Sequence, residues 1–188
     1  MRLFLAVACQ EQWTRSVATA LDALRSGPIG ELPIRWTNPE VWHVTLQFLG
    51  NWPTDRLEGL QTALDAARER EPFGLIPAGL GGFPKLNRPR VLFLQLNDDG
   101  QAADLAGRVR EIVRDCWSGG PQDTRPFRCH LTLGRIRERT PVEKFKLLQD
   151  MELRDLPPLA VEGFSLVASE LRAEGPRHET LAYFPLRK

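Results

Sequence analysis

The sequence predicts an α+β fold built from two related lobes. Strand-like and helix-like segments alternate, but the last two strands follow each other directly, which favours an α+β or mixed sheet over a regular doubly wound parallel one. A His-x-Thr-Leu segment in a strand-like apolar frame occurs twice, at 43–46 and 130–133, each time after a helix and a loop, which indicates a weak internal repeat. Because no long linker separates the halves, the 188 residues are expected to form a single bilobal domain, 1–188.

The first third of the chain begins with a strand and a helix. The apolar run 3–9 passes directly into a helical pattern, so we interpret it as a buried strand rather than a secretory leader. Residues 11–25 predict an amphipathic helix, whose apolar positions are Trp13, Val17, Leu21 and Leu24. Residues 27–40 are rich in Gly and Pro and predict a loop with at most a short strand at 34–36.

The middle of the chain adds two helices and three strands. A strand at 42–50 precedes Pro53, where a helix can begin, and its apolar stripe is Leu57, Leu60, Leu64 and Ala67. Strands are predicted at 73–80 and 91–96, separated by the loop sequence GGFPKLNRPR. Residues 99–117 predict a third helix, with an inward face formed by Leu105, Val109, Ile112 and Val113.

The last third contains a strand, a short helix and a hairpin. The strand CHLTLGRI follows a Gly/Pro-rich break, and Thr140-Pro141 marks the start of a short helix ending near residue 151. Strands at 159–168 and 180–186 close the chain, and we expect them to pair as a hairpin.

Composition limits the possible functions. The formal net charge is +1, which argues against general attraction to nucleic acid, so any basic site must be local. Three cysteines without a CxxC pair favour a reducing compartment, where we interpret them as small buried hydrophobes. No stretch approaches the roughly 18 apolar residues of a membrane span, so a cytoplasmic location and no membrane contact are expected.

The two His-x-Thr segments, WHVTLQFLG at 42–50 and CHLTLGR at 129–135, carry the chemical signal. Because strand side chains alternate between faces, we expect one polar face and one apolar face in each copy. In the first copy the polar face is His43, Thr45 and Gln47, and the apolar face is Val44, Leu46 and Phe48. In the second the polar face is His130, Thr132 and Gly134, and the apolar face is Cys129, Leu131 and Leu133.

One polar strand face is ordinary, but two copies that share the threonine offset and use two of three histidines indicate a common site. Two imidazoles suit phosphodiester chemistry, since one can act as a base while the other acts as an acid near neutral pH. Threonine hydroxyls can donate to the non-bridging phosphate oxygens. No carboxylate stands at ligand spacing beside either motif, so neither a metal nor another cofactor is expected.

Arg135 directly follows the second motif. Strict alternation would point its side chain away from His130, and a bulge at Gly134 would be needed to bring the two to one face. A phosphate clamp and a solvated surface arginine therefore both remain open.

Other residues could border the same site. Lys85, Arg88, Arg90, Arg125 and Arg128 could form a basic rim for an RNA end, with Phe83 as a stacking partner, although charged loops are often merely solvated. His178 also precedes a threonine at the same spacing, in HETL, but we expect it at the surface entrance of a strand.

The HVTL and HLTL segments resemble the paired HxTx motifs of the two-histidine (2H) phosphoesterase superfamily, and within it the bacterial RNA 2′,3′-cyclic phosphodiesterases, or 2′-5′ RNA ligase-like proteins. The likeness covers nearly the whole chain. It includes RLFLAV, PEVWHVTLQFLG, FPKLNRPRVLFL, RPFRCHLTLGR and LAYFPL.

The resemblance implies a bilobal fold with pseudo-twofold symmetry, each lobe a mixed or antiparallel sheet flanked by helices, and an active-site groove between the lobes. It implies an enzyme that hydrolyses RNA 2′,3′-cyclic phosphodiester ends to 2′-phosphomonoesters. His43 would be the proton donor and His130 the proton acceptor. Thr45, Thr132 and Arg135 would bind the phosphate. The resemblance also implies reversible 2′-5′ RNA ligation.

Two alternatives stay open at this stage. The chain could be a non-catalytic RNA-end or nucleotide-binding module, or a related phosphodiesterase that acts on another cyclic phosphate or on a 2′-5′ linkage. The expected partner is an RNA with a 2′,3′-cyclic phosphate end or a small cyclic nucleotide, bound by a monomer.

Overall fold

The computed structural model describes residues 1–117, 119, 126–137, 141–149, 151, 153, 155–172 and 175–187. Its strands are β1 (Arg2–Ala8), β2 (Ile34–Trp36), β3 (His43–Asn51), β4 (Phe73–Phe83), β5 (Val91–Asn97), β6 (His130–Ile136), β7 (Leu159–Val161), β8 (Gly163–Arg172) and β9 (Gly175–Pro185). Its helices are α1 (Glu11–Arg25), α2 (Leu57–Leu64) and α3 (Gln101–Cys116), with 3-10 segments η1 (Pro28–Glu31), η2 (Pro39–Val41), η3 (Thr54–Arg56), η4 (Asp65–Arg68) and η5 (Val142–Gln149).

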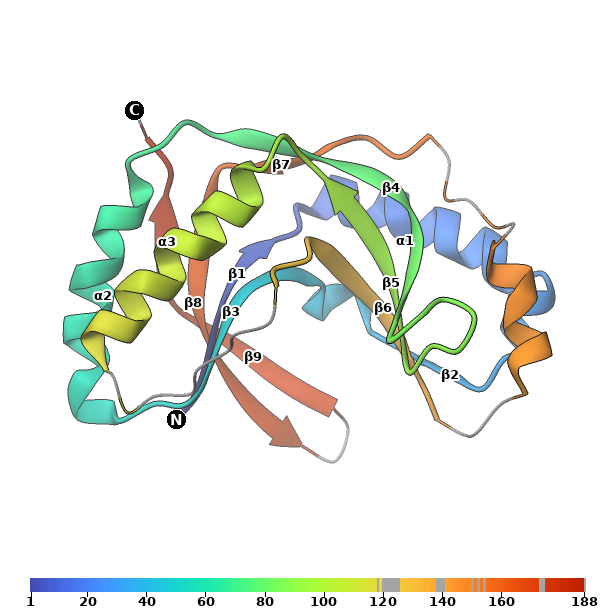
Figure 1. Ribbon diagram of the computed structural model, residues 1–188, viewed down its shortest axis with the longest axis horizontal. Helices are drawn as coiled ribbons and strands as arrows, with labels where there is room; N and C mark the ends of the chain where they lie inside the picture. Colours follow the sequence, from blue (N-terminus) through green and yellow to red (C-terminus); the bar gives the residue numbers. More distant parts are fainter. Residues whose placement is uncertain are drawn as a thin grey trace.

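One antiparallel sheet runs through the whole molecule and has two related halves (Figure 1). Its strand order is β7-β4-β5-β6-β3-β1-β8-β9, with β2 added to β6. The halves meet where β3 pairs with β6 through the single register pair Val44–Leu131, and both side chains are fully buried. The flanking strands β1 and β5 also correspond, since they share the sequence Leu-Phe-Leu at 3–5 and 92–94. The predicted α+β fold is confirmed.

A β-bulge interrupts both His-x-Thr strands at the same offset. In β3, Thr45 pairs with Ala6 and Gln47 with Leu5, so Leu46 is the extra residue. In β6, Thr132 pairs with Phe93 and Gly134 with Leu92, so Leu133 is the extra residue. The two strands consequently begin with the same order of buried and half-buried positions. An extra residue reverses the alternation of the side chains that follow it, and in β3 the reversal extends to a second extra residue, Leu49.

The bulge in β3 corrects two predicted orientations. Gln47 was expected beside His43, but it is buried at 4% exposure, and its Oε1 accepts a hydrogen bond from Nε of Arg110 on α3. Phe48 was expected in the core, but it is 48% exposed, and its ring lies 6.2 Å from that of Phe4. The prediction from strict alternation was wrong here because nothing in the sequence pattern indicates the extra residue at Leu46.

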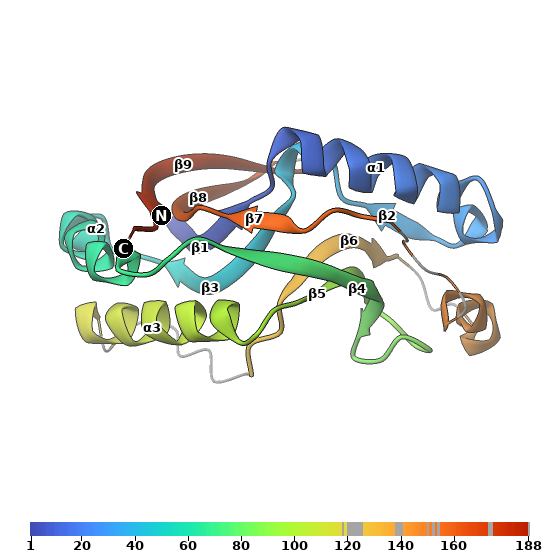
Figure 2. The ribbon, with the colours of Figure 1, turned by 90° about the horizontal axis from the view of Figure 1, so that it is seen from above.

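The sheet curls until its two ends approach each other (Figure 2). Only Glu162 separates β7, which pairs with β4, from β8, which pairs with β1. The predicted strand at 159–168 is therefore two strands that join opposite halves of the sheet. The predicted hairpin is confirmed between β8 and β9, and β9 begins earlier than expected, at Gly175.

The helices cover the core side of the sheet. The predicted inward faces of α1 and α3 are confirmed by the burial of residues such as Val17 and Val109. The Arg110–Gln47 hydrogen bond ties α3 to β3, and the guanidinium of Arg25 on α1 lies 5.4 Å from the ring centroid of Trp36 on β2. Figures 1 and 2 show α2 and α3 on the β1–β3 side and α1 on the β2–β6 side.

Two other predictions need adjustment. The short helix expected at 140–151 is the 3-10 segment η5, and Thr140 lies outside the described residues. The strand expected at 73–80 extends to Phe83, so Gly81 belongs to β4 rather than to a loop. A Cβ atom at Gly81 would approach the Phe93 ring to 2.2 Å, so this glycine makes room for an aromatic side chain in a paired strand.

The cysteines are free and pack against the core, but all three are half-buried where full burial was predicted. Burial raises the pKa of Cys9 and of Cys129 to about 12, which keeps both thiols protonated and unreactive. Within the described residues, no helix has the length and apolarity that a membrane crossing requires.

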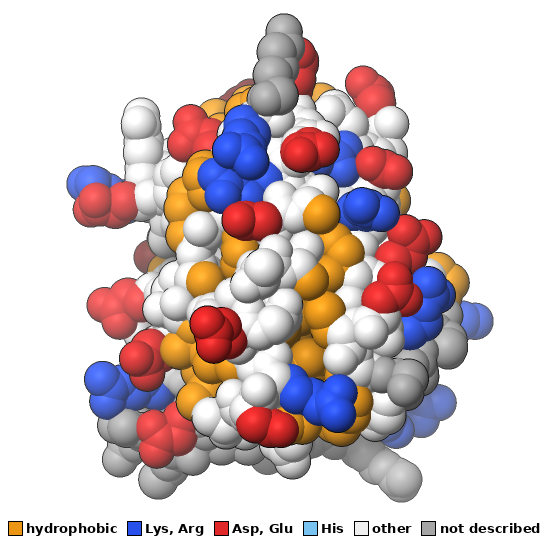
Figure 3. Space-filling model, turned by 90° about the vertical axis from the view of Figure 1, so that its left-hand side faces the viewer, with side chains coloured by type: hydrophobic (Ala, Val, Ile, Leu, Met, Phe, Trp, Pro, Cys, Tyr) orange, Lys and Arg blue, Asp and Glu red, His pale blue; other side chains and the backbone are white. Residues whose placement is uncertain are grey.

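The outer surface over α2 and α3 has no single charge sign. Acidic and basic side chains are interspersed on this face (Figure 3), and Arg70 pairs with Asp104 at 3.0 Å.

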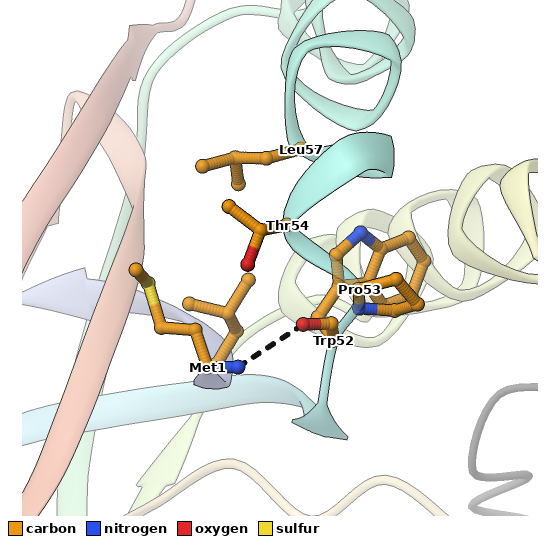
Figure 4. Close-up of a pocket in the computed structure, with 6 residues that line it drawn as sticks. Met1, Trp52, Pro53, Thr54 and Leu57 are labelled. Atoms are coloured by element: carbon orange, nitrogen blue, oxygen red, sulfur yellow. Dashed lines mark hydrogen bonds between the residues drawn. The ribbon is translucent and has the colours of Figure 1, made fainter.

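Figure 4 shows a small pocket where the N-terminal ammonium of Met1 donates to the Trp52 carbonyl at 3.1 Å, beside Pro53, Thr54 and Leu57. This contact ties the start of β1 to the end of β3.

Gly134 is predicted to be required for packing between β2 and β6. A Cβ atom there would approach Ile34 Cγ2 to 2.6 Å and the Arg35 carbonyl oxygen to 3.0 Å. Gly134→Ala should lower the free energy of unfolding by about 1–3 kcal/mol, as overpacking does elsewhere. Urea unfolding followed by circular dichroism measures this change.

Gly107→Ala is the matched control, because a Cβ atom at Gly107 in α3 would meet nothing within 4 Å. It should stabilise the protein by roughly 0.5–1 kcal/mol through helix propensity. An unchanged urea midpoint for Gly134→Ala would contradict the packing argument.

Candidate active site

The Val44–Leu131 pair brings both His-x-Thr motifs to one surface. Continuing the antiparallel register by one residue in each direction places His43 opposite Thr132 and Thr45 opposite His130. Diagonal neighbours of this kind have Cα atoms about 7–8 Å apart, which leaves room for a phosphate between the histidine rings. We call the surface that carries His43, Thr45, His130 and Thr132 the histidine face.

Both imidazole rings are held in the same orientation by their own strands. Nδ1 of His43 lies 2.8 Å from the carbonyl oxygen of Val41, and Nδ1 of His130 lies 2.6 Å from that of Arg128. A carbonyl oxygen only accepts, so Nδ1 carries the proton in each ring. Nε2 is consequently the atom that gains or loses a proton in both histidines.

Aromatic rings support each histidine from a neighbouring strand. The Phe4 ring of β1 lies 4.7 Å from the His43 ring, between centroids. The rings of Phe83 and Phe93 each lie 5.1 Å from the His130 ring. Phe4 and Phe93 are the central residues of the two Leu-Phe-Leu segments, so the supports follow the internal repeat.

His178 lies beside His43, which corrects its expected place at a surface strand entrance. It lies within β9, half-buried, with its ring 5.3 Å from that of His43 and 5.0 Å from that of Phe4. The hairpin register that folds β9 back along β8 brings it there. The HETL spacing was a signal for this histidine, but it does not reveal which strand His178 meets.

Burial keeps the three histidines uncharged near neutral pH. Desolvation lowers the pKa of His43 to about 4; the hydrogen bond to Val41 opposes the shift, and the charges of His178 and His130 add to it. Desolvation also lowers the pKa of His130, against its bond to Arg128, and the pKa of His178. An anion between the rings would favour the charged imidazolium.

The bulge in β6 places Arg135 on the histidine face. After the extra residue Leu133, Arg135 pairs with Val91, which shares a side of β5 with Phe93. The orientation that alternation left open is therefore toward His130. Gly134 instead turns to the core, where it pairs with Leu92.

Arg35 is a candidate that the sequence did not reveal. It pairs directly with Arg135 across β2 and β6, so both exposed guanidinium groups extend from the same side of the sheet. Like charges directly opposite each other in a sheet are destabilising. Neither arginine has an ion-pair partner in the part of the chain that the structure describes. Such a pair can bind an anion.

The predicted basic rim borders His130 only. The guanidinium of Arg128 lies 5.8 Å from the ring centroid of Phe83, and Lys85, Arg88 and Arg90 are exposed in the segment after Phe83. The Arg90 carbonyl accepts from the Ile136 amide, which fixes that segment beside β6. Arg125 lies outside the described residues.

Phe48 occupies the place in the first motif that Arg135 occupies in the second. Each follows its threonine by three residues, and each reaches the histidine face through a bulge. Aligning HVTLQF with HLTLGR would have paired these residues, so a signal existed in the sequence.

Among the described residues, no group of three His, Cys, Asp or Glu side chains could hold a metal ion.

Comparison with known proteins points to one family. The model of the LigT-like phosphoesterase family matches the chain twice, over residues 13–93 and 96–178. An RNA 2′,3′-cyclic phosphodiesterase from Archaeoglobus fulgidus is 29% identical over 98% of this chain and 99% of its own. One from Thermus thermophilus is 32% identical over 100% of this chain and 91% of its own.

Solved structures agree with this comparison. A crystal structure of a Thermus thermophilus protein matches with a TM-score of 0.79 and 30% identity, covering 100% of this chain and 98% of that one. The structure of E. coli LigT complexed with 3′-AMP matches with a TM-score of 0.75 and 24% identity over the same shares. At that identity, the second likeness supports the fold alone.

The lowered pKa of His43 predicts a pH dependence of stability. An unfolded histidine titrates near pH 6.5, so between about pH 6.5 and 4 the unfolded chain binds more protons than the folded one. Stability should therefore fall with the pH across this window. His43 should account for roughly 2–3 kcal/mol of the loss at pH 4.5.

The measurement is urea unfolding of the wild type and of His43→Gln at pH 7.5 and pH 4.5. The variant should lose less stability between the two pH values, because carboxylates contribute equally to both proteins. Equal losses in the two proteins would contradict the prediction.

Proposed function

The chain belongs to the LigT-like phosphoesterase family, and from that premise we propose that it is an enzyme that hydrolyses RNA 2′,3′-cyclic phosphodiester ends to 2′-phosphomonoesters. The observation that carries the proposal is the pair of His-x-Thr motifs on one surface, with both Nε2 atoms free to exchange protons. Two such groups on either side of a phosphate are what acid-base cleavage of a P–O bond requires.

The two histidines divide the proton transfers. Neutral His130 accepts a proton at Nε2 from a water molecule as the water oxygen attacks phosphorus. Protonated His43 donates its Nε2 proton to the ribose 3′ oxygen as the P–O3′ bond breaks, which leaves the phosphate on the 2′ oxygen. With the same roles, the 5′ hydroxyl of a second RNA in place of water would form a 2′-5′ linkage, a ligation that dilution in water disfavours.

The cyclic phosphate itself supplies the charge that His43 needs. Burial disfavours the imidazolium in the free protein. One negative charge 4–5 Å from the ring is worth about 3–4 kcal/mol at an effective dielectric constant near 20, which corresponds to two or three pKa units. Substrate binding therefore charges the acid at the point where it is used.

Four side chains can hold the phosphate oxygens. The hydroxyls of Thr45 and Thr132 extend from the histidine face and can donate hydrogen bonds to non-bridging oxygens. Arg135 offers a planar pair of donors beside His130, and Arg35 adds a second guanidinium directly opposite. The half-exposed ring of Phe48 lies on the His43 side and can stack on the terminal nucleobase.

The working unit takes one catalytic histidine from each lobe, so we infer that residues 1–188 act as one bilobal domain. We propose that it works as a cytoplasmic monomer without a metal cofactor. The basic residues beside Phe83 are assigned to the body of the RNA. A binding module without turnover, or a phosphodiesterase for another cyclic phosphate or a 2′-5′ linkage, would give a different product pattern.

Removal of either histidine is the main test of the proposed function. His43→Ala and His130→Ala should each lower the hydrolysis rate of a short RNA with a 2′,3′-cyclic end by roughly 10²–10⁴-fold, the usual contribution of a general acid or base. Chromatography against 2′- and 3′-phosphate standards should identify a 2′-phosphate product. A chelator should not change the wild-type rate.

Circular dichroism checks that both variants fold. Wild-type protein that binds the cyclic end without releasing a 2′-phosphate would favour the binding module. Full turnover in both histidine variants would exclude the assignment.

Removal of the Arg35 side chain is expected to lower activity by less than removal of either histidine. Arg35→Ala should lower kcat/KM for the same RNA by about 10- to 100-fold, because one charge-assisted contact of about 1.5–3 kcal/mol is lost. The salt dependence of kcat/KM should also become shallower. Arg135→Ala should cost more, about 10²–10³-fold, as removal of a donor to the transition state does.

The control is Arg15→Ala, which removes an exposed arginine on α1 that pairs with Glu11. It should leave kcat/KM and its salt dependence unchanged. An Arg35→Ala enzyme with wild-type kinetics would show that Arg135 binds the phosphate alone.

A further inference from the structure

His178 contacts the reactive face but has no part in the proton transfers described above. We propose that His178 is a positioning residue for His43: its ring holds the His43 ring in place, and below neutral pH, where His178 takes up a proton, its charge opposes a proton on His43. This inference rests on the proposed function of His43, but its first test does not depend on catalysis.

The rings of His43, Phe4 and His178 form a closed cluster in which each ring contacts the other two. The centroid distances are 4.7 Å for Phe4–His43, 5.0 Å for Phe4–His178 and 5.3 Å for His43–His178, and the two His178 contacts are edge-on. Such distances are those of favourable aromatic pairs. Together with the hydrogen bond from Nδ1 to Val41, the cluster fixes the direction of His43 Nε2.

The other lobe has the same cluster with one different member. Around His130 the centroid distances are 5.1 Å to Phe93, 5.1 Å to Phe83 and 4.4 Å between the two phenylalanines. Phe83 thus takes the place that His178 takes beside His43. Both catalytic histidines are therefore supported by two rings. Among the described residues, a titratable ring is part of that support only beside His43, the proposed acid.

The charge of His178 acts mainly on His43. Its partner on β8 is Ser169, the neighbouring pair on that side of the hairpin is Val167 and Thr180, and β1 contributes Phe4. Arg177 and Glu179 flank His178 in sequence and point to the opposite side of β9. On the side that His178 presents to β1 and β3, the charged or titratable groups among the described residues are His43 and Arg2, which shares a side of β1 with Phe4.

A proton on His178 opposes a proton on His43, because two positive rings about 5 Å apart repel each other. A phosphate anion bound beside His43 offsets this repulsion. At pH values where His178 is protonated, it therefore lowers the charged fraction of His43 in the empty site, and a bound phosphate restores that fraction. His178→Phe would keep the packing against the His43 ring but remove the charge that opposes a proton on His43.

The first experiment is an NMR titration of the histidine rings in ¹⁵N-labelled, ligand-free protein. In His178→Phe, the pKa of His43 should rise by about 0.5–1 unit, because a repulsion that solvent screens at the half-buried His178 is lost while the packing stays. The Nδ1-protonated form of neutral His43 should be unchanged. Phe83→Leu is the matched control in the other lobe and should leave the pKa of His43 unchanged.

The second experiment follows kcat/KM between pH 4.5 and 8.5 with the RNA substrate. In His178→Phe, the acidic limb should move to higher pH by the same 0.5–1 unit, with kcat at pH 7.5 within about threefold of wild type. His178→Ala removes the ring as well and should lower kcat by about tenfold. His178→Gln serves as a second uncharged variant if the phenylalanine variant does not fold.

The two results separate the two proposals. An unchanged His43 titration in every folded uncharged variant would overturn the role of His178, whether or not the protein is active. Equal losses of kcat in His178→Phe and His178→Ala would also overturn it, because ring support would then have no separate effect. Loss of the proposed function itself would appear instead as full turnover in His43→Ala.

Discussion

The single register pair between Val44 and Leu131 is the constraint on which the site depends. Both side chains are completely buried at the point where the two halves of the sheet join. Each is the middle residue of a His-x-Thr motif, so pairing them sets both histidines and both threonines on one face in an antiparallel arrangement. A shift of one residue in either strand would turn one motif into the core.

The repeated bulge then places a different side chain on the histidine face in each half. An extra leucine after each threonine turns the residue three places beyond the threonine back to the histidine face. In the first half that residue is Phe48, an aromatic surface, and in the second it is Arg135, a cation beside Arg35. A nucleoside and its phosphate need these two kinds of contact side by side, so one symmetric frame can orient an asymmetric ligand.

Electrostatics complete this division. The chain is nearly neutral overall, yet several exposed arginines and a lysine gather near His130, while the surroundings of His43 are mainly aromatic. Burial leaves the histidines uncharged near neutral pH in the empty site, so in the proposed function the arginines supply the positive charge that first attracts an anion. The anion in turn makes protonation of His43 favourable.

The sequence alone determined the helices, most strand positions, the family resemblance and the pairing of His43 with His130, because hydrophobic periodicity and motif spacing are local properties. It could not determine the bulges at Leu46 and Leu133, which depend on the partner strands and which decided the orientation of Gln47, Phe48 and Arg135. Arg35 and His178 became part of the site only through pairing of β2 with β6 and folding of β9 along β8. These contacts join residues far apart in the chain, and their geometry is set by packing between strands rather than by the pattern within any one of them.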